Sequence, residues 1–193
     1  KQKRNTINLW CKIVVACLPA AVIGLLFDDI LDKYLYNYVV VALMLIIYGI
    51  FFILIEKKNE HTRPQVTKLT YQMALIIGGF QVLALIPGTS RSGATILGAL
   101  LIGTSRYVAT EFTFYLAIPV MFGASILKVI KFGFHYTAIE VVILLVGCLV
   151  AFFVSVFAIK FLMGYIKKHD FKAFGYYRIV LGVLVLLYFL IFG

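Results

Sequence analysis

The sequence predicts an all-α, polytopic membrane protein with five spanning helices and one re-entrant helix hairpin. The chain is 63% hydrophobic with a mean hydropathy of +1.04, whereas a soluble domain is about 45–50% apolar. The apolar residues form long runs, and a polar turn at Pro87–Gly93 separates two shorter ones. These observations indicate a single membrane domain covering residues 1–193.

The five predicted spans are apolar runs close to the length of about 20 residues that a helix needs to cross a bilayer. Strands are excluded because an open strand would leave its backbone groups unpaired in lipid. The predicted spans are approximately Cys11–Phe27, Asn37–Ile55, Glu111–Ile130, Ala138–Leu162 and Tyr176–Phe192.

A sixth apolar region consists of two short arms, Tyr71–Ile86 and Ser92–Gly103, on either side of the polar turn. They form either one broken span or a re-entrant hairpin over about residues 71–103. With a hairpin, most of the 18 Lys and Arg residues fall on one side of the membrane. A single crossing would largely remove this asymmetry. The positive-inside rule therefore favours the hairpin and makes the lysine-rich side cytoplasmic.

The number of spans after the hairpin suggests an inverted repeat. Three predicted spans follow it, and an odd number inverts the second copy of a unit made of one hairpin and three spans. We therefore expect this hairpin to be part of an inverted repeat, with a first hairpin outside this chain. The expectation depends on parity alone, because the sequence shows no convincing internal repeat.

The net charge of +10 does not indicate a nucleic-acid-binding protein. The basic residues lie between the apolar runs and not along one soluble face, so their expected role is to orient the spans. Membrane lipid is the expected surrounding, no nucleic-acid partner is expected, and a homo-oligomer is compatible with the sequence.

Arg91, in the polar turn, is the residue that most strongly indicates a function. An arginine at membrane depth costs about 2.5–3.5 kcal/mol, so it needs a partner. One interpretation is a structural ion pair, for which Glu111 is the nearest candidate. The favoured interpretation is an anion site, because hydroxyls, flexible glycines and a helix start surround the guanidinium. These neighbours are Gly88, Thr89, Ser90, Ser92, Gly93 and Thr95.

Gln81 is a further candidate, because it is a polar residue within the first apolar arm. It either contacts the substrate or forms a hydrogen bond to a neighbouring helix, and the sequence leaves both interpretations open. No residues have a spacing that indicates a metal site, so no metal ligand is predicted.

The segment from Gly78 to Ile96, GGFQVLALIPGTSRSGATI, resembles the signature of bacterial undecaprenyl-diphosphate phosphatases, also called bacitracin-resistance proteins. The segments Ser105–Phe112 and Leu116–Pro119 match the same pattern. The resemblance covers the whole chain, and its motifs are highly specific.

This resemblance implies hydrolysis of undecaprenyl diphosphate to undecaprenyl phosphate and inorganic phosphate in the bacterial plasma membrane. That reaction recycles the lipid carrier for cell-wall (peptidoglycan) synthesis and confers bacitracin resistance. The implied substrate is a polyprenyl diphosphate lipid, held in a pocket that opens toward the outer face, and Mg²⁺ or another divalent cation is the implied cofactor. The expected catalytic residues are Arg91, Ser90 and Thr95, and the expected substrate-binding residues are Thr89, Ser92, Gly88, Gly93 and Gln81.

The chain departs from the family pattern in one respect. Nothing in it matches the family's acidic N-terminal motif that ends in Ser-Ser-Thr-Gly-His, which is thought to supply the nucleophile or general base. We therefore expect the chain to be the larger C-terminal part of such an enzyme, with weak phosphate binding and little catalysis by itself. The alternative function is a transporter or flippase for an anionic lipid or small anion, since broken helices in inverted repeats also suit that class.

Overall fold

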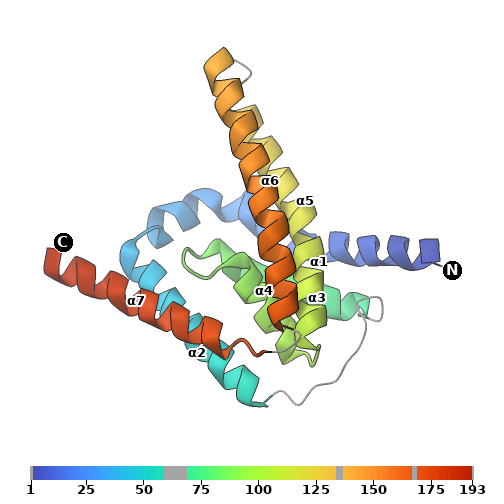
Figure 1. Ribbon diagram of the computed structural model, residues 1–193, viewed down its shortest axis with the longest axis horizontal. Helices are drawn as coiled ribbons and strands as arrows, with labels where there is room; N and C mark the ends of the chain where they lie inside the picture. Colours follow the sequence, from blue (N-terminus) through green and yellow to red (C-terminus); the bar gives the residue numbers. More distant parts are fainter. Residues whose placement is uncertain (1, 59–68, 134–136, 167–168, 193) are drawn as a thin grey trace.

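The computed structural model describes residues 2–58, 69–133, 137–166 and 169–192, and all the elements within these ranges are helical (Figure 1). The helices are α1 (Gln2–Leu35), α2 (Tyr38–Lys58), α3 (Tyr71–Val82), the 3₁₀ turn η2 (Leu83–Leu85), α4 (Arg91–Leu101), α5 (Arg106–Phe132), α6 (Ala138–Ile166) and α7 (Lys172–Phe192).

Five of these helices are long and apolar enough to cross a membrane, which confirms the all-α class and the expectation of five spanning helices. The spanning segments are Arg4–Phe27, Tyr38–Lys57, Arg106–Lys131, Ala138–Ile166 and Lys172–Phe192. Several begin earlier than predicted, because a helix can continue through polar residues beyond an apolar run. The start of α5 is an example, since the Ser105 hydroxyl caps it by accepting the Val108 amide at 3.3 Å.

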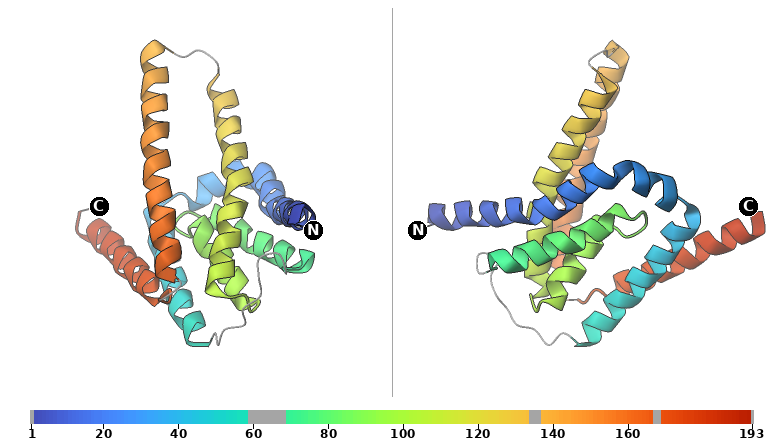
Figure 2. Two further views of the ribbon diagram at one scale, coloured as in Figure 1. Left: turned by 45° about the vertical axis from the view of Figure 1, so that its right-hand side comes forward. Right: turned by 180° about the vertical axis from the view of Figure 1, so that it is seen from behind.

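The two short arms form α3 and α4, which run antiparallel and pack closely against each other. A Cβ atom added to Gly98 of α4 would lie 2.5 Å from the Phe80 ring of α3, so the glycine allows this approach. Gly78 of α3 allows an equally close approach to the backbone of Ala16 in α1, so that α3 packs against α1 (Figure 2). The helix hairpin itself is therefore present, and its re-entry into the bilayer stays a prediction, as does the inverted repeat.

Helices α2 and α7 form the most extensive helix pair and lie side by side in every view (Figures 1 and 2). Glycines bring their backbones together. A Cβ atom added to Gly175 would lie 2.8 Å from the Gly49 carbonyl oxygen, and one added to Gly182 would lie 2.8 Å from that of Ala42. Small residues at a membrane helix interface allow such close packing. The contact fixes the position of α7 beside the hairpin.

A buried carboxylate, Glu56, joins three helix ends. It accepts hydrogen bonds from Nε of Arg106 at 2.8 and 3.0 Å and from the Phe171 amide at 3.2 Å. The Glu56 side chain is only 1% exposed. These contacts tie the end of α2 to the start of α5 and to the segment just before α7.

Helix α6 rises beside α5, away from the rest of the protein (Figure 1). Its residues are exposed from Ala138 to Phe161, and its spanning segment has a mean hydropathy of 3.0. A helix that is apolar on nearly every side and has few protein neighbours suits a lipid environment. The site-bearing part of the fold is therefore formed by the other helices.

Candidate functional site

The turn between α3 and α4 has an unusual backbone. Ser90 has φ 66°, which is rare for a residue other than glycine, and Gly88 has φ 87°. A Cβ atom on Gly88 would collide with the Val41 backbone of α2. Strained conformations of this kind tend to gather at functional sites. The turn is thus held in a shape that its local sequence alone does not favour.

Ser90 is the N-cap of α4, so the helix begins at Arg91 and not at Ser92 or beyond. The Ser90 hydroxyl accepts the Gly93 amide at 3.3 Å and lies 3.3 Å from the Ser92 hydroxyl. The first amides of a helix have no acceptor within it. The amides of Arg91 and Ser92 therefore belong to the positive end of the α4 dipole, beside both hydroxyls.

Arg91 has no carboxylate partner in the part of the chain that the structure describes. The ion pairs in that part join Arg106 to Glu56 and Lys172 to Asp170. One terminal nitrogen of Arg91, Nη1, is buried and has no hydrogen-bond partner. Glu111 therefore does not serve as the structural partner, and the geometry supports the anion interpretation of Arg91.

Thr95 lies at the base of the turn and is completely buried. Its hydroxyl donates toward two carbonyl oxygens, that of Arg91 at 3.0 Å and that of Ser92 at 3.2 Å. The same hydroxyl accepts a hydrogen bond from the Thr113 hydroxyl of α5 at 3.0 Å. Thr95 thus links the first turn of α4 to α5, in a place where it supports the turn from below.

Gln81 and Thr89 are buried polar residues whose side chains lack partners. Gln81 is 3% exposed and Thr89 is 0% exposed. Within the described ranges, the buried side-chain polar atoms without a hydrogen-bond partner belong to Gln81, Thr89, Arg91 and Arg178. Buried polar groups are normally bonded. Thr89 and Arg91 belong to the turn and Arg178 contacts it, as expected for a site that binds a polar ligand or water. Gln81 lies on α3, the helix that leads into the turn.

Arg178 is a site residue that the sequence pattern does not single out, because it is one of many basic residues expected to orient the spans. It is buried at 4% exposure in α7. Its Nη2 atom donates to the carbonyl oxygens of Gly88 at 2.6 Å and Thr89 at 2.9 Å. The available signal was that Arg178 lies inside a predicted span, where a charge needs a partner.

The site's donor set does not fit a protein-bound divalent cation. Mg²⁺ is held by carboxylate oxygens, and no group of three or more His, Cys, Asp or Glu side chains gathers anywhere in the described ranges. The turn supplies guanidinium groups and hydroxyls, and Arg178 occupies the carbonyl oxygens of Gly88 and Thr89.

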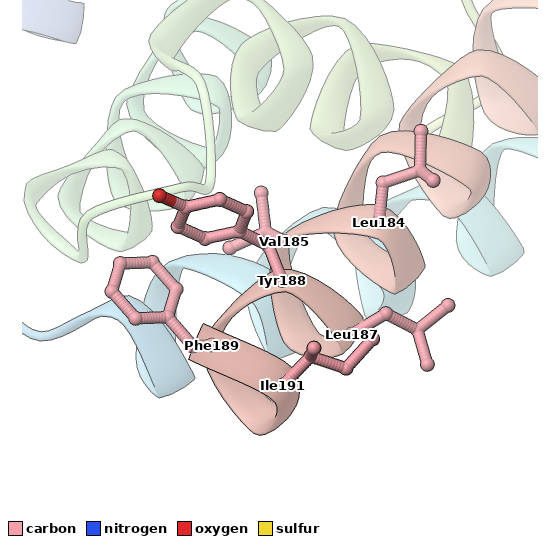
Figure 3. A pocket seen from close by; sticks show the side chains of 6 residues that line it. All are labelled: Leu184, Val185, Leu187, Tyr188, Phe189 and Ile191. Atoms are coloured by element: carbon pink, nitrogen blue, oxygen red, sulfur yellow. The ribbon is translucent and has the colours of Figure 1, made fainter. Parts of the chain in front are cut away.

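A shallow apolar hollow lies on α7 (Figure 3). Its lining residues are Leu184, Val185, Leu187, Tyr188, Phe189 and Ile191. They follow Arg178 along the helix and carry a single polar group, the Tyr188 hydroxyl. The hollow offers no group for phosphate and is not the candidate site.

Five apolar helices, and a helix start at which the Nη1 atom of Arg91 is buried without a partner, indicate a multi-pass membrane protein with a candidate site for an anion. Comparison of the sequence with known families gives a match of residues 1–184 to the family described as bacitracin resistance protein BacA. The chain belongs to this family, and the resemblance predicted from its motifs is confirmed.

Similar proteins from several bacteria are named undecaprenyl-diphosphatase. The protein from Acetivibrio thermocellus is 62% identical over 191 residues, which cover 97% of this chain and 70% of the relative. The protein from Desulfitobacterium hafniense is 63% identical over 191 residues, covering 97% and 69%. The protein from Enterococcus faecalis is 60% identical over 196 residues, covering 98% and 71%.

Proposed function

We propose that this chain acts in the hydrolysis of undecaprenyl diphosphate to undecaprenyl phosphate and inorganic phosphate in the bacterial plasma membrane. The proposal extends the activity named for its relatives to this chain. The observation that carries it is Arg91, the first residue of α4, whose buried Nη1 atom has no partner. A helix start beside a guanidinium is suited to phosphate.

In the proposed reaction, an oxygen nucleophile attacks the terminal phosphorus of the diphosphate. A new P–O bond forms while the bond to the bridging oxygen breaks, and undecaprenyl phosphate leaves with the bridging oxygen. Arg91 binds two oxygens of the transferred group and neutralises the charge that develops on them. The hydroxyls of Ser90 and Ser92 orient the remaining oxygens, and Thr95 holds the α4 start in place. A requirement for Mg²⁺ stays a prediction.

The contact between the turn and α2 supports access from the outer face. Gly88 packs against Val41, which lies near the Tyr38 end of α2. The distribution of Lys and Arg residues predicts that this end of α2 faces outward. A diphosphate headgroup in the outer leaflet would therefore reach the turn without crossing the membrane, which is the arrangement that recycling of the cell-wall lipid carrier requires.

The test is phosphate release from undecaprenyl diphosphate by the protein in lipid vesicles. Arg91→Ala should lower kcat by about 10²–10³-fold, the effect of removing one preorganised donor to the transition state. Arg91→Lys should retain part of the rate, because it keeps the charge and loses the planar fork. Lys172→Ala, which removes an exposed cation on α7, is the control and should match the parent protein.

Two results would contradict the proposal. An Arg91→Ala protein that releases phosphate at the parent rate would exclude this role for the turn. Movement of the lipid across the vesicle membrane without phosphate release would favour the transporter or flippase that the sequence left as an alternative.

A further inference from the structure

We infer that Arg178 is a positioning residue of this site, which holds the Pro87–Gly93 turn in the conformation that binds the diphosphate. The inference rests on the proposed function, since it concerns the same turn. Arg178 follows Gly88 by 90 residues along the chain, and it contacts the turn through the backbone carbonyl oxygens of the turn.

The hydrogen bonds of Arg178 fix two successive peptide groups. Nη2 donates to the carbonyl oxygens of Gly88 at 2.6 Å and Thr89 at 2.9 Å. In a planar trans peptide, the N–H group points away from the carbonyl oxygen. With the Thr89 carbonyl directed at Arg178, the Ser90 amide is directed away from it. The guanidinium therefore determines which way the amides of the turn face.

The turn needs such a restraint because its backbone is strained. Ser90 has φ 66°, and a residue other than glycine held there costs of order 1–3 kcal/mol unless its surroundings enforce it. Val41 of α2 blocks the turn on the Gly88 side. Arg178 bonds to it from α7, and its Nη1 atom lies 3.6 Å from the position that a Cβ atom on Gly93 would occupy. One guanidinium thus reaches both ends of the turn.

Packing leaves Arg178 little freedom to move. Its residue position on α7 lies between Gly175 and Gly182, the two glycines in close contact with the backbone of α2. Its guanidinium carbon lies 5.9 Å from the centre of the Tyr48 ring, an arrangement that favours a cation. The side chain is therefore preorganised to hold the turn before any ligand arrives.

Arg178 also adds positive charge to the site. In the described ranges it forms no ion pair with a carboxylate, as is true of Arg91. Its Nε atom is buried without a hydrogen-bond partner. Two guanidinium groups next to one helix start, that of Arg178 buried and that of Arg91 partly buried, favour a ligand with more than one negative charge, such as a diphosphate.

The experiment measures amide hydrogen exchange in the turn and the affinity for inorganic pyrophosphate in detergent micelles. The variants are Arg178→Ala and Arg178→Lys, and Lys172→Ala is the control at the exposed start of the same helix. In Arg178→Ala, exchange of the amides from Gly88 to Gly93 should rise by about tenfold or more, because the turn opens locally. Pyrophosphate affinity should fall by about 10- to 100-fold, the loss expected for charge-assisted hydrogen bonds.

Further readouts separate positioning from a general structural role. Arg178→Lys should recover part of the affinity, and guanidinium ion added at millimolar concentration should partly restore Arg178→Ala. Exchange in α2 and the rest of α7 should stay at the parent rate. The inference is overturned if the turn exchanges at the parent rate in Arg178→Ala, or if exchange rises equally throughout α2 and α7.

The outcomes distinguish this inference from the proposed function. Pyrophosphate binding that depends on Arg91 but not on Arg178 would leave the function standing and refute the positioning role. No pyrophosphate binding by the parent protein would count against the proposed function, and the exchange rates of the turn would still decide what Arg178 does.

Discussion

Replacing Glu56 by Ala should destabilise the protein by much more than breaking the Asp170–Lys172 ion pair. The Glu56 side chain is 1% exposed and accepts hydrogen bonds from both Arg106 and the Phe171 amide. Its removal leaves a guanidinium that is 23% exposed and a buried amide without their acceptor. Breaking one side of a buried ion pair costs about 3–5 kcal/mol.

Thermal unfolding in micelles measures this effect. For a chain of this size, about 1 kcal/mol corresponds to about 2–4 °C, so Glu56→Ala should lower Tm by about 10 °C. Glu56→Gln, which keeps an acceptor but loses the charge, should give a smaller decrease. The matched control is Asp170→Ala, because the Asp170–Lys172 pair is partly exposed to solvent and worth at most about 1 kcal/mol.

A double-mutant cycle tests the cause. If the stranded Arg106 charge is the main penalty, Glu56→Ala combined with Arg106→Ala should be less destabilising than the sum of the two single changes. Strictly additive effects, or a Glu56→Ala protein that melts within about 2 °C of the parent, would refute the reasoning.

Three further predictions concern the helix packing, the turn and pH. Gly182→Ala should lower Tm, because the added methyl group pushes α2 and α7 apart. The control is Gly147→Ala on α6, where no neighbouring atom lies within 4 Å of the added methyl group; it should leave Tm unchanged or raise it, since Ala favours a helix over Gly by about 1 kcal/mol. Equal Tm values for the two variants would contradict the close packing of α2 and α7. Gly88→Ala should reduce phosphate release by about tenfold or more, because φ 87° is strained for Ala and its Cβ has no room; a parent-like rate would argue against a fixed turn. Burial raises the pKa of Asp170, but the hydrogen bonds from Lys172 and the nearby positive charges together lower it by more, so the pKa lies below the ordinary 3.8. The stability that Asp170 contributes is therefore complete above pH 3.8 and is lost as the pH falls through its lower folded pKa. The Tm difference between the parent and Asp170→Asn should shrink accordingly in a melting series, and a difference that grows on acidification would be the wrong sign.

Much of the architecture follows from the sequence because membrane insertion depends on properties that are local in the chain. Long apolar runs predict spans, and the run boundaries lie within a few residues of the helices for α2 and α6. The polar turn with Arg91 is also visible locally, since hydroxyls, glycines and a charge occur together between apolar arms. The motif was specific enough to predict the family that the comparison confirms.

The partners of the site residues were not predictable in the same way. Arg178 lies in a helix that is apolar on nearly all sides, so the pattern of residues does not reveal which face meets another helix. Its contact with Gly88 and Thr89 joins positions about 90 residues apart. The hydrogen bond from Thr113 to Thr95 and the ion pair between Glu56 and Arg106 are also long-range.

By itself, the sequence determined which segments are apolar enough to span lipid and where the polar turn with Arg91 lies, because hydropathy and motif chemistry are read along the chain. Only the tertiary structure decided that Arg91 has no carboxylate partner in the described ranges and that Arg178 holds the turn. The physical reason is that glycines along α2 and α7 set how closely these helices approach. That approach, which is a property of two distant segments together, selects the side chains that reach the site.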